Sequence, residues 1–232
     1  MALFIKGLIT LPDKNTIKIV LLFTLATFCL FQAINIWGAN YSALFLDLAV
    51  AVPVVLAVLR KEIINSAVYL TFLLAVFGTM LALKIFSGGE IIWTGLLWSL
   101  GALVANGLFI EYAKDAIQAK WNKVFWMSLG LVIVGLVSFS EVLSLQTIEI
   151  QYYWLLVILF ALSTGILNFY FAFLAFENLK PIEVGVLILG VTPSIILASY
   201  FMLGKSLSVD QILGVAITLL ATMIFGRFLS KI

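Results

Sequence analysis

Apolar residues in this chain form eight continuous stretches of about twenty positions, and short polar segments separate each stretch from the next. An α-helix of about 20 apolar residues is long enough to cross the hydrocarbon core of a bilayer. The pattern therefore predicts an all-α, polytopic membrane protein with eight transmembrane helices. The predicted helices span residues 17–38, 42–60, 63–84, 91–111, 122–139, 152–176, 183–203 and 210–229.

The composition is strongly apolar. Hydrophobic residues make up 64% of the 232 residues and charged residues only 10%. Such a chain has too little polar side-chain area to cover a water-soluble globule. We therefore expect an integral membrane protein whose surroundings are the lipid bilayer.

The basic residues are distributed unevenly between the two sides that the eight helices define. Eleven of the 13 lie on the side that carries both termini, and only Lys84 and Lys205 lie on the other. Short loops rich in lysine and arginine stay in the cytoplasm. We therefore expect both termini to be cytoplasmic, in a prokaryotic plasma (inner) membrane.

Two of the apolar stretches resemble one another around Pro53 and Pro193. We call the separation of these two prolines along the chain the proline interval, and at the same interval Thr24 corresponds to Thr164. In the predicted topology the Pro53 helix runs from outside to inside, and the Pro193 helix runs in the opposite direction. Inverted repeats of this kind form transporters whose substrate site lies near the bilayer midplane, between the repeats.

The C-terminal copy contains the more specific motifs, which are Asn178-Leu-Lys-Pro-Ile-Glu-Val-Gly, Val191-Thr-Pro193, Leu203-Gly-Lys205-Ser-Leu-Ser and Gln211-Ile-Leu-Gly214. These motifs resemble the penultimate helix, the following turn and the last helix of the drug/metabolite transporter superfamily, EamA type. Lys205 departs from the family pattern, because family members usually carry a glutamate in that turn.

The resemblance implies two five-helix inverted repeats, of which this chain would lack the first two helices of the usual ten. It divides the chain into a cytoplasmic or interfacial N-terminal segment (1–16), a truncated first repeat with three transmembrane helices (17–90) and a second repeat with five (91–232).

Asp47 is the one carboxylate well inside an apolar stretch. Acids within membrane helices are costly and usually functional, so Asp47 is interpreted as a site for a proton, a cation or a cationic substrate. Hydration at the outer interface is the alternative. Pro53 and Pro193 interrupt backbone hydrogen bonding and are interpreted as hinges or as static kinks. The other predicted cavity residues, for which helix packing is the alternative role, are Asn35, Asn168, Thr24, Thr164, Trp98 and Asn106.

The residue types that enzymes and metal sites commonly use are scarce. The chain has no histidine and a single cysteine, Cys29, within an apolar stretch. We therefore expect no enzymatic activity, no metal and no cofactor. The cytoplasmic loops explain the net charge of +2, so no nucleic-acid partner is expected.

These observations predict a secondary transporter that moves a small polar or amphiphilic organic solute by alternating access, with proton coupling through Asp47 as one option. The alternative is a non-transporting scaffold or accessory subunit that docks a partner protein or a lipid in the groove left by the missing helices. A homodimer and a different membrane-protein partner are both left open.

Overall fold

The computed structural model describes residues 11–37, 39–61, 66–85, 92–114, 120–142, 168–203 and 206–229, which form helices joined by short turns. Within these ranges there is no strand, so the predicted all-α fold is confirmed for them. The helices are α2 (Lys14–Trp37), α3 (Ala39–Asp47), the 3₁₀ turn η1 (Leu48–Val50), α4 (Ala51–Leu59), α5 (Ser66–Ala82), α6 (Trp93–Ala113), α7 (Lys120–Val142), α9 (Asn168–Asn178), α10 (Pro181–Ile188), α11 (Val191–Leu203) and α12 (Val209–Leu229).

The predicted apolar stretches coincide with these helices wherever the structure describes them. In the described part of the chain, α2 and α6 are long and apolar enough to cross a membrane, by length and composition, and the other apolar segments are shorter. The 21 residues of α6 span about 30 Å at about 1.5 Å per residue, which matches the thickness of a hydrocarbon core. The predicted stretch 152–176 is described only from residue 168 onward.

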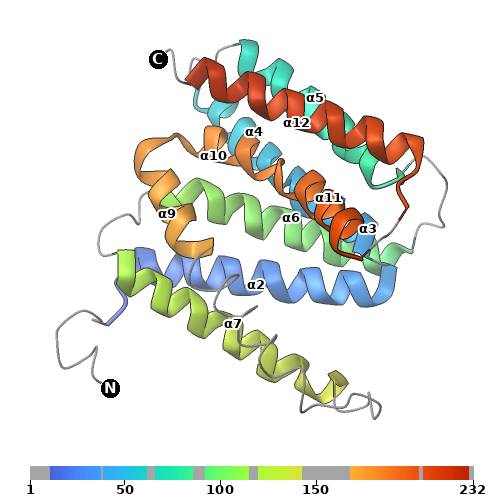
Figure 1. The fold of residues 1–232 in the computed structure, drawn as a ribbon. Helices are drawn as coiled ribbons and strands as arrows, with labels where there is room; N and C mark the ends of the chain where they lie inside the picture. The colour runs from blue at the N-terminus through green and yellow to red at the C-terminus, as the bar shows by residue number, and fades with distance from the viewer. Residues whose placement is uncertain are drawn as a thin grey trace.

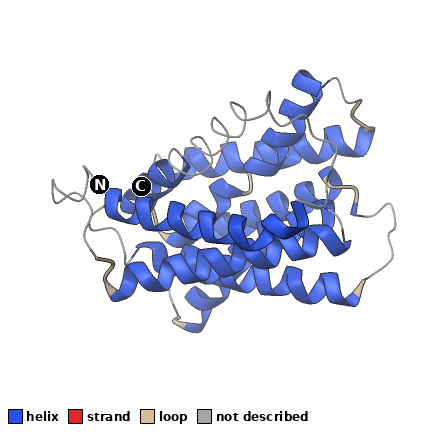
Figure 2. Cartoon of the chain, turned by 90° about the horizontal axis from the view of Figure 1, so that it is seen from below, coloured by secondary structure: helices blue, strands red, loops and turns tan. Residues whose placement is uncertain are grey.

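The helices are arranged in layers (Figure 1). On one side α5 packs along α12, and on the other α2 packs against α6 and α7. The segments α3–α4 and α10–α11 lie between these two groups (Figure 1). The view turned by 90° shows the same side-by-side packing of the long helices (Figure 2).

Asp13 caps the N-terminus of α2. Its Oδ1 accepts a hydrogen bond from the backbone N–H of Thr16 at 2.7 Å, which satisfies one of the free N–H groups of the first turn. Hydrogen bonds from the Thr16 side chain and backbone lower the pKa of the Asp13 carboxyl, and the charge of Lys123 lowers it further.

A cluster of aromatic rings joins α2, α6 and α9. The ring centroid of Phe23 lies 5.3 Å from that of Phe109 and 4.9 Å from that of Phe169. Phe109 also meets Phe176, with 6.3 Å between centroids. Tilted and edge-to-face pairs of this kind contribute about 0.5–1.5 kcal/mol each beyond their burial. The cluster therefore fixes the described part of α9 against α2 and α6.

Both stretches that contain the paired prolines are interrupted helices. In the first copy α3 ends at Asp47, the 3₁₀ turn Leu48–Val50 follows, and α4 begins at Ala51. In the second copy α10 ends at Ile188 and α11 begins at Val191. The residues that flank the interruptions, Asp47, Val50, Ala51 and Leu189, keep right-handed helical dihedral angles. Each stretch is therefore a helix whose hydrogen-bond pattern is interrupted locally before its proline.

The prolines explain where these interruptions lie. A proline cannot donate a backbone hydrogen bond to the carbonyl four residues earlier, and its ring crowds that carbonyl. For Pro53 this carbonyl belongs to Ala49, and for Pro193 it belongs to Leu189, so both carbonyls lie inside the breaks. Each proline is the third residue of the helix that follows, where its missing N–H would have no partner within the helix in any case.

Helix boundaries recur at the proline interval. The start of α11 at Val191 follows the start of α4 at Ala51 by this interval. The end of α9 at Asn178 follows the end of α2 by the same interval to within one position. The end of α10 at Ile188 follows the end of α3 in the same way. The agreement at α4 and α11 follows from the paired prolines, whereas the ends of α2 and α9 lie outside their reach and add to the match.

The contact between α5 and α12 depends on small residues. A methyl group in place of the Gly78 hydrogen would lie 2.8 Å from the Thr218 nitrogen and 2.9 Å from the Gly214 carbonyl oxygen. The Thr218 hydroxyl is 2.9 Å from the Gly214 carbonyl and 3.4 Å from that of Ala75, and it can donate to either. Gly78 and Thr218 are themselves separated by the proline interval, so the helices cross at corresponding positions of the two copies.

The two interrupted helices run in opposite directions. Asp47 meets Thr192, whereas Val50, which comes later in the chain than Asp47, meets Gly185, which comes earlier than Thr192. The order of contacts reverses, which defines an antiparallel pair. Figure 1 shows the same arrangement, with α4 beside α10 and α3 beside α11.

Candidate functional site at the two helix breaks

A buried hydrogen bond joins the two helix breaks. Asp47 is the last residue of α3, and only 5% of its surface is exposed. The hydroxyl of Thr192, the second residue of α11, donates to Asp47 Oδ2 at 2.6 Å. Thr192 is buried as well, so the pair is enclosed between α3 and α11.

The start of α11 provides a favourable setting for a carboxyl group. The first turn of a helix has backbone N–H groups without partners inside the helix, and these carry partial positive charge. Thr192 lies in that turn, and its hydroxyl is the donor that the Asp47 carboxyl meets there. This arrangement offsets part of the cost of burying an acid.

The chemistry of the pair suits reversible protonation. A threonine hydroxyl has one hydrogen to donate and two lone pairs to accept, whereas an ionised carboxylate can only accept. The Thr192 hydroxyl can therefore donate to ionised Asp47 and accept from protonated Asp47 without moving away. The pair is able to hold a proton.

Two glycines allow the first break to pack closely against its neighbours. A methyl group on Gly185 of α10 would lie 2.6 Å from Val50 Cγ1, and one on Gly107 of α6 would lie 2.6 Å from the Ala49 carbonyl oxygen. That carbonyl is the one left without its usual donor by Pro53. The backbone of α6 therefore closes over the break in the first copy.

Thr24 and Trp98, two of the predicted cavity residues, take part in helix packing. The Thr24 hydroxyl on α2 fills the space in which a side chain at Gly130 of α7 would stand. The Trp98 ring on α6 packs edge-to-face on Phe28 of α2, with 5.8 Å between centroids. These contacts hold α2 against its two neighbours.

The remaining predicted residues are less closely defined. Asn35 lies exposed near the end of α2, and Asn106 is half-buried on α6. Thr164 lies outside the described residues. Asn168 is the first described residue of α9, and its side chain is not among those that the structure describes. Of the predicted cavity residues, Asp47 is therefore the one that the structure places in a defined contact between the two breaks.

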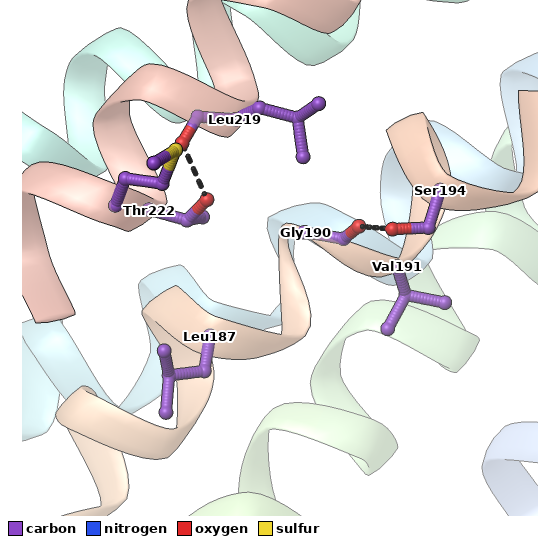
Figure 3. A pocket seen from close by; sticks show the side chains of 7 residues that line it. Leu187, Gly190, Val191, Ser194, Leu219 and Thr222 are labelled. Atoms are coloured by element: carbon purple, nitrogen blue, oxygen red, sulfur yellow. Dashed lines mark hydrogen bonds between the residues drawn. The ribbon is translucent and has the colours of Figure 1, made fainter. Parts of the chain in front are cut away.

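A second feature beside the breaks is an open groove of about 630 Å³ between the α10–α11 break and α12. Figure 3 shows its walls, with Gly190 and Ser194 on one side and Thr222 on the other. The Ser194 hydroxyl donates to the Gly190 carbonyl at 2.7 Å, and the Thr222 hydroxyl lies 3.0 Å from the Leu219 carbonyl. We call this feature the α11–α12 groove, and its lining residues are Leu187, Gly190, Val191, Ser194, Leu219, Thr222 and Met223.

The sequence did not identify Thr192 as a site residue, although it lies in the Val191-Thr-Pro193 motif. A threonine within an apolar stretch most often bonds its own helix or a neighbouring one, so its type alone gives no signal. The usable signal is its position directly before one of the paired prolines. The partner across the fold is visible only in the structure.

Comparison of the chain with protein-family models and with curated proteins gives no match, so the interpretation of the Asp47–Thr192 site depends on its residues and geometry.

Proposed function

We propose that this protein is a secondary membrane transporter of the drug/metabolite type, which moves a small polar or amphiphilic organic solute by alternating access. In this proposal the eight apolar stretches cross the membrane and both termini are cytoplasmic. The solute and the coupling proton bind at the two helix breaks, near the middle of the bilayer.

The observation that carries the proposal is the pair of antiparallel interrupted helices joined by a buried acid. Prolines are tolerated in membrane helices where local 3₁₀ adjustments and neighbouring helices satisfy the freed backbone groups. Interrupted helices with an ionisable group between them are typical of transporter sites at the midplane. A protein that served only as an anchor would have no need of this costly arrangement.

The recurring helix boundaries support two related halves. The ends of α2 and α3 and the start of α4 recur in α9, α10 and α11 at nearly the same interval. The crossing of α5 with α12 pairs Gly78 with Thr218, at that interval again. Related halves in opposite orientation provide the two equivalent conformations that alternating access requires.

Charged and aromatic contacts support the proposed orientation. The Lys18 ammonium near the start of α2 lies 2.9 Å from the ring centroid of Tyr112 near the end of α6. Arg60, just after α4, pairs with Glu111, also near the end of α6. These cations gather at the end of the molecule where α2 begins and α12 ends (Figure 1). A basic end of this kind is expected on the cytoplasmic side.

The residue types at the breaks indicate the solute class. Asp47 is able to attract a cationic or hydrogen-bonding group, and the surrounding α3, α4 and α10 residues are mainly apolar. A solute that combines a small polar group with an apolar body matches both the Asp47 carboxyl and the apolar residues around it. Protonation of Asp47 would release a cationic group, which would link solute movement to a proton gradient.

Proteoliposomes provide the test. We expect purified protein to accumulate at least one solute from a panel of amino acids, nucleosides, sugars and cationic amphiphiles under an imposed proton gradient. Asp47→Asn keeps an oxygen for Thr192 but cannot take up a proton, so it should lose gradient-driven accumulation. It should retain exchange of a neutral solute at equal pH. Asp210→Asn, at the exposed start of α12, is the matched control and should behave as wild type.

The outcomes separate the parts of the proposal. If neither accumulation nor exchange is observed for any solute of the panel with wild-type protein, the transport proposal is wrong. If Asp47→Asn accumulates solute as well as wild type does, transport stands and the role of Asp47 in coupling is wrong.

A further inference from the structure

Thr79 of α5 carries a buried hydroxyl that has no hydrogen-bond partner among the described residues. The residue is completely buried, and its Oγ1 meets no donor or acceptor there. Hydroxyls in apolar helices often donate to a carbonyl of their own helix, as those of Thr27, Thr218 and Thr222 do in this chain. The Thr79 hydroxyl makes no such bond, so it is available to a ligand.

The correspondence between the two halves places Thr79 opposite Asp47. At the proline interval Asp47 corresponds to Leu187, and Thr79 corresponds to Leu219. Leu187 and Leu219 line the α11–α12 groove from α10 and from α12. Helix α5 packs against α3 in the first half as α12 packs against α10 in the second. Thr79 and Asp47 therefore lie on facing helices, in the buried counterpart of the groove.

The packing one turn away gives the same placement. Ala75 precedes Thr79 by one turn of α5 and belongs to a buried cluster with Val50 and Leu189. Val50 follows the buried acid by three residues, and Leu189 precedes its hydroxyl donor by three. Because α5 runs in the same direction as α10–α11 (Figure 1), the step from Ala75 to Thr79 leads from this cluster to the level of the buried hydrogen bond.

The helices around the two breaks offer no positive charge to Asp47. Helices α3, α4, α5, α6, α10 and α11 contain neither lysine nor arginine. An ionised carboxylate is costly in an apolar interior unless a cation or several donors compensate it. The Thr192 hydroxyl is the one donor that the described residues provide to this carboxyl. Asp47 therefore needs either a proton or a cation from outside the protein.

The oxygen atoms at this point suit a small cation. Carboxylate, hydroxyl and carbonyl oxygens are the ligands that hard cations prefer, and the Thr79 and Thr192 hydroxyls both have lone pairs to offer. The Leu189 carbonyl, which receives no donor from Pro193, adds a backbone oxygen at the second break. Backbone carbonyls freed in interrupted helices coordinate sodium in several transporter folds.

We propose that Asp47, Thr79 and Thr192 bind a sodium ion. The one carboxylate balances the single charge of the ion, and the two hydroxyls supply further oxygen ligands. Because Thr79 is completely buried and the other two residues nearly so, the enclosure fits an ion better than an organic solute. Binding itself does not require transport, and only a role for sodium as a coupling ion rests on the proposed function.

Equilibrium binding of radioactive sodium to the purified full chain in detergent micelles, at fixed mildly alkaline pH, tests the proposal. Asp47→Asn removes the charge, Thr79→Val removes the hydroxyl at nearly constant volume, and Thr79→Ser restores it. The matched control is Ser128→Ala on α7, because the Ser128 hydroxyl is likewise buried without a partner among the described residues and α7 packs against α2 and α9.

We expect wild type to show saturable binding that excess sodium chloride displaces and choline chloride does not. Asp47→Asn should abolish binding and Thr79→Val should weaken it by at least about tenfold, whereas Thr79→Ser and Ser128→Ala should retain it. Sodium should raise the Tm of wild type above its value in choline at equal ionic strength, and Asp47→Asn should lose this shift. In choline, Thr79→Val should be at least as stable as wild type, because it removes an unsatisfied buried hydroxyl.

Four results would overturn the proposal. They are wild type without saturable sodium binding, displacement by choline as effective as that by sodium, unchanged binding in Thr79→Val, and equal losses in Thr79→Val and Ser128→Ala. Absent sodium binding together with solute accumulation in proteoliposomes would refute the ion site and leave the transport proposal standing. Sodium binding with this dependence on Thr79, in a protein that moves no solute, would support the site and refute transport.

Discussion

The Asp47–Thr192 hydrogen bond makes a prediction that needs no knowledge of the solute. At the proline interval, Asp47 corresponds to Leu187 and Thr192 corresponds to Val52. The double variant Asp47→Leu with Thr192→Val therefore gives this pair the apolar side chains of its counterpart. We expect each single variant to be less stable than wild type and the double variant to recover part of the loss.

The magnitude follows from burial and geometry. Thr192→Val leaves a buried carboxyl without its hydroxyl donor, and an unsatisfied buried polar group costs about 1–3 kcal/mol. Interhelical hydrogen bonds in a membrane protein average about 0.6 kcal/mol, with a maximum of about 1.7. Because this bond is 2.6 Å long and both partners are buried, we expect a coupling energy between about 1 and 2 kcal/mol. Thr192→Ser keeps the hydroxyl and should cost less than Thr192→Val.

The assay is reversible unfolding in detergent micelles, followed by tryptophan fluorescence, for wild type, both single variants and the double variant. Independent substitutions add within about 0.3–0.5 kcal/mol. If the free energies of unfolding add within that margin, the two side chains are not coupled, and the reasoning from the hydrogen bond is refuted. A double variant less stable than either single variant would refute it equally.

Three further predictions concern packing, pH and topology. Gly78→Ala should lower the free energy of unfolding by about 1–3 kcal/mol because its methyl group would meet the α12 backbone. Gly135→Ala, at a position where nothing lies within 4 Å, should be neutral or stabilising. Equal losses of stability in the two variants would contradict the close crossing of α5 with α12. Asp13→Ala should cost about 0.5–2 kcal/mol at neutral pH through loss of the α2 cap. Because the pKa of Asp13 is lowered in the folded state, the stabilisation by this cap is present above the unfolded pKa of about 3.9. It should disappear as the pH falls from there through the lower pKa of the folded state. A loss of stability in Asp13→Ala that does not change with pH would contradict this. With the native cysteine removed, an impermeant maleimide should label a cysteine at Lys61 only from the cytoplasmic side and one at Lys84 only from outside; labelling of both from one side would refute the topology.

The sequence predicted the helices, and it singled out Asp47, which the structure places in a buried hydrogen bond; the role of this residue stays a prediction. The long apolar stretches separated by short polar segments coincide with helices wherever the structure describes them, so helix positions follow from the pattern of apolar residues. A lone acid within an apolar stretch stands out for the same reason. The paired prolines also indicated where the helices would be disturbed, because a proline affects the carbonyl four residues earlier regardless of the fold.

The partners of these residues were beyond sequence reasoning. A polar side chain on a helix can face any of several neighbours, and helical spacing does not say which. Thr24 was predicted as a cavity residue with helix packing as the alternative, and its hydroxyl lies against Gly130. Thr192 was not selected, although it bonds the one buried acid of the proposed site. The open α11–α12 groove depends on which helix faces are covered, and that too requires the three-dimensional arrangement.

The crossing of α5 with α12 has a consequence for any cycle in which the two halves exchange their conformations. Under such an exchange each contact takes the geometry that its counterpart had before. The Gly78–Thr218 contact is its own counterpart, because the two residues correspond to each other, so it is invariant. The Asp47–Thr192 contact instead exchanges with Val52–Leu187, a pair that has no polar atoms in its side chains. The Gly78–Thr218 contact would therefore stay the same throughout such a cycle, whereas the Asp47–Thr192 hydrogen bond would break and form again once in each turnover.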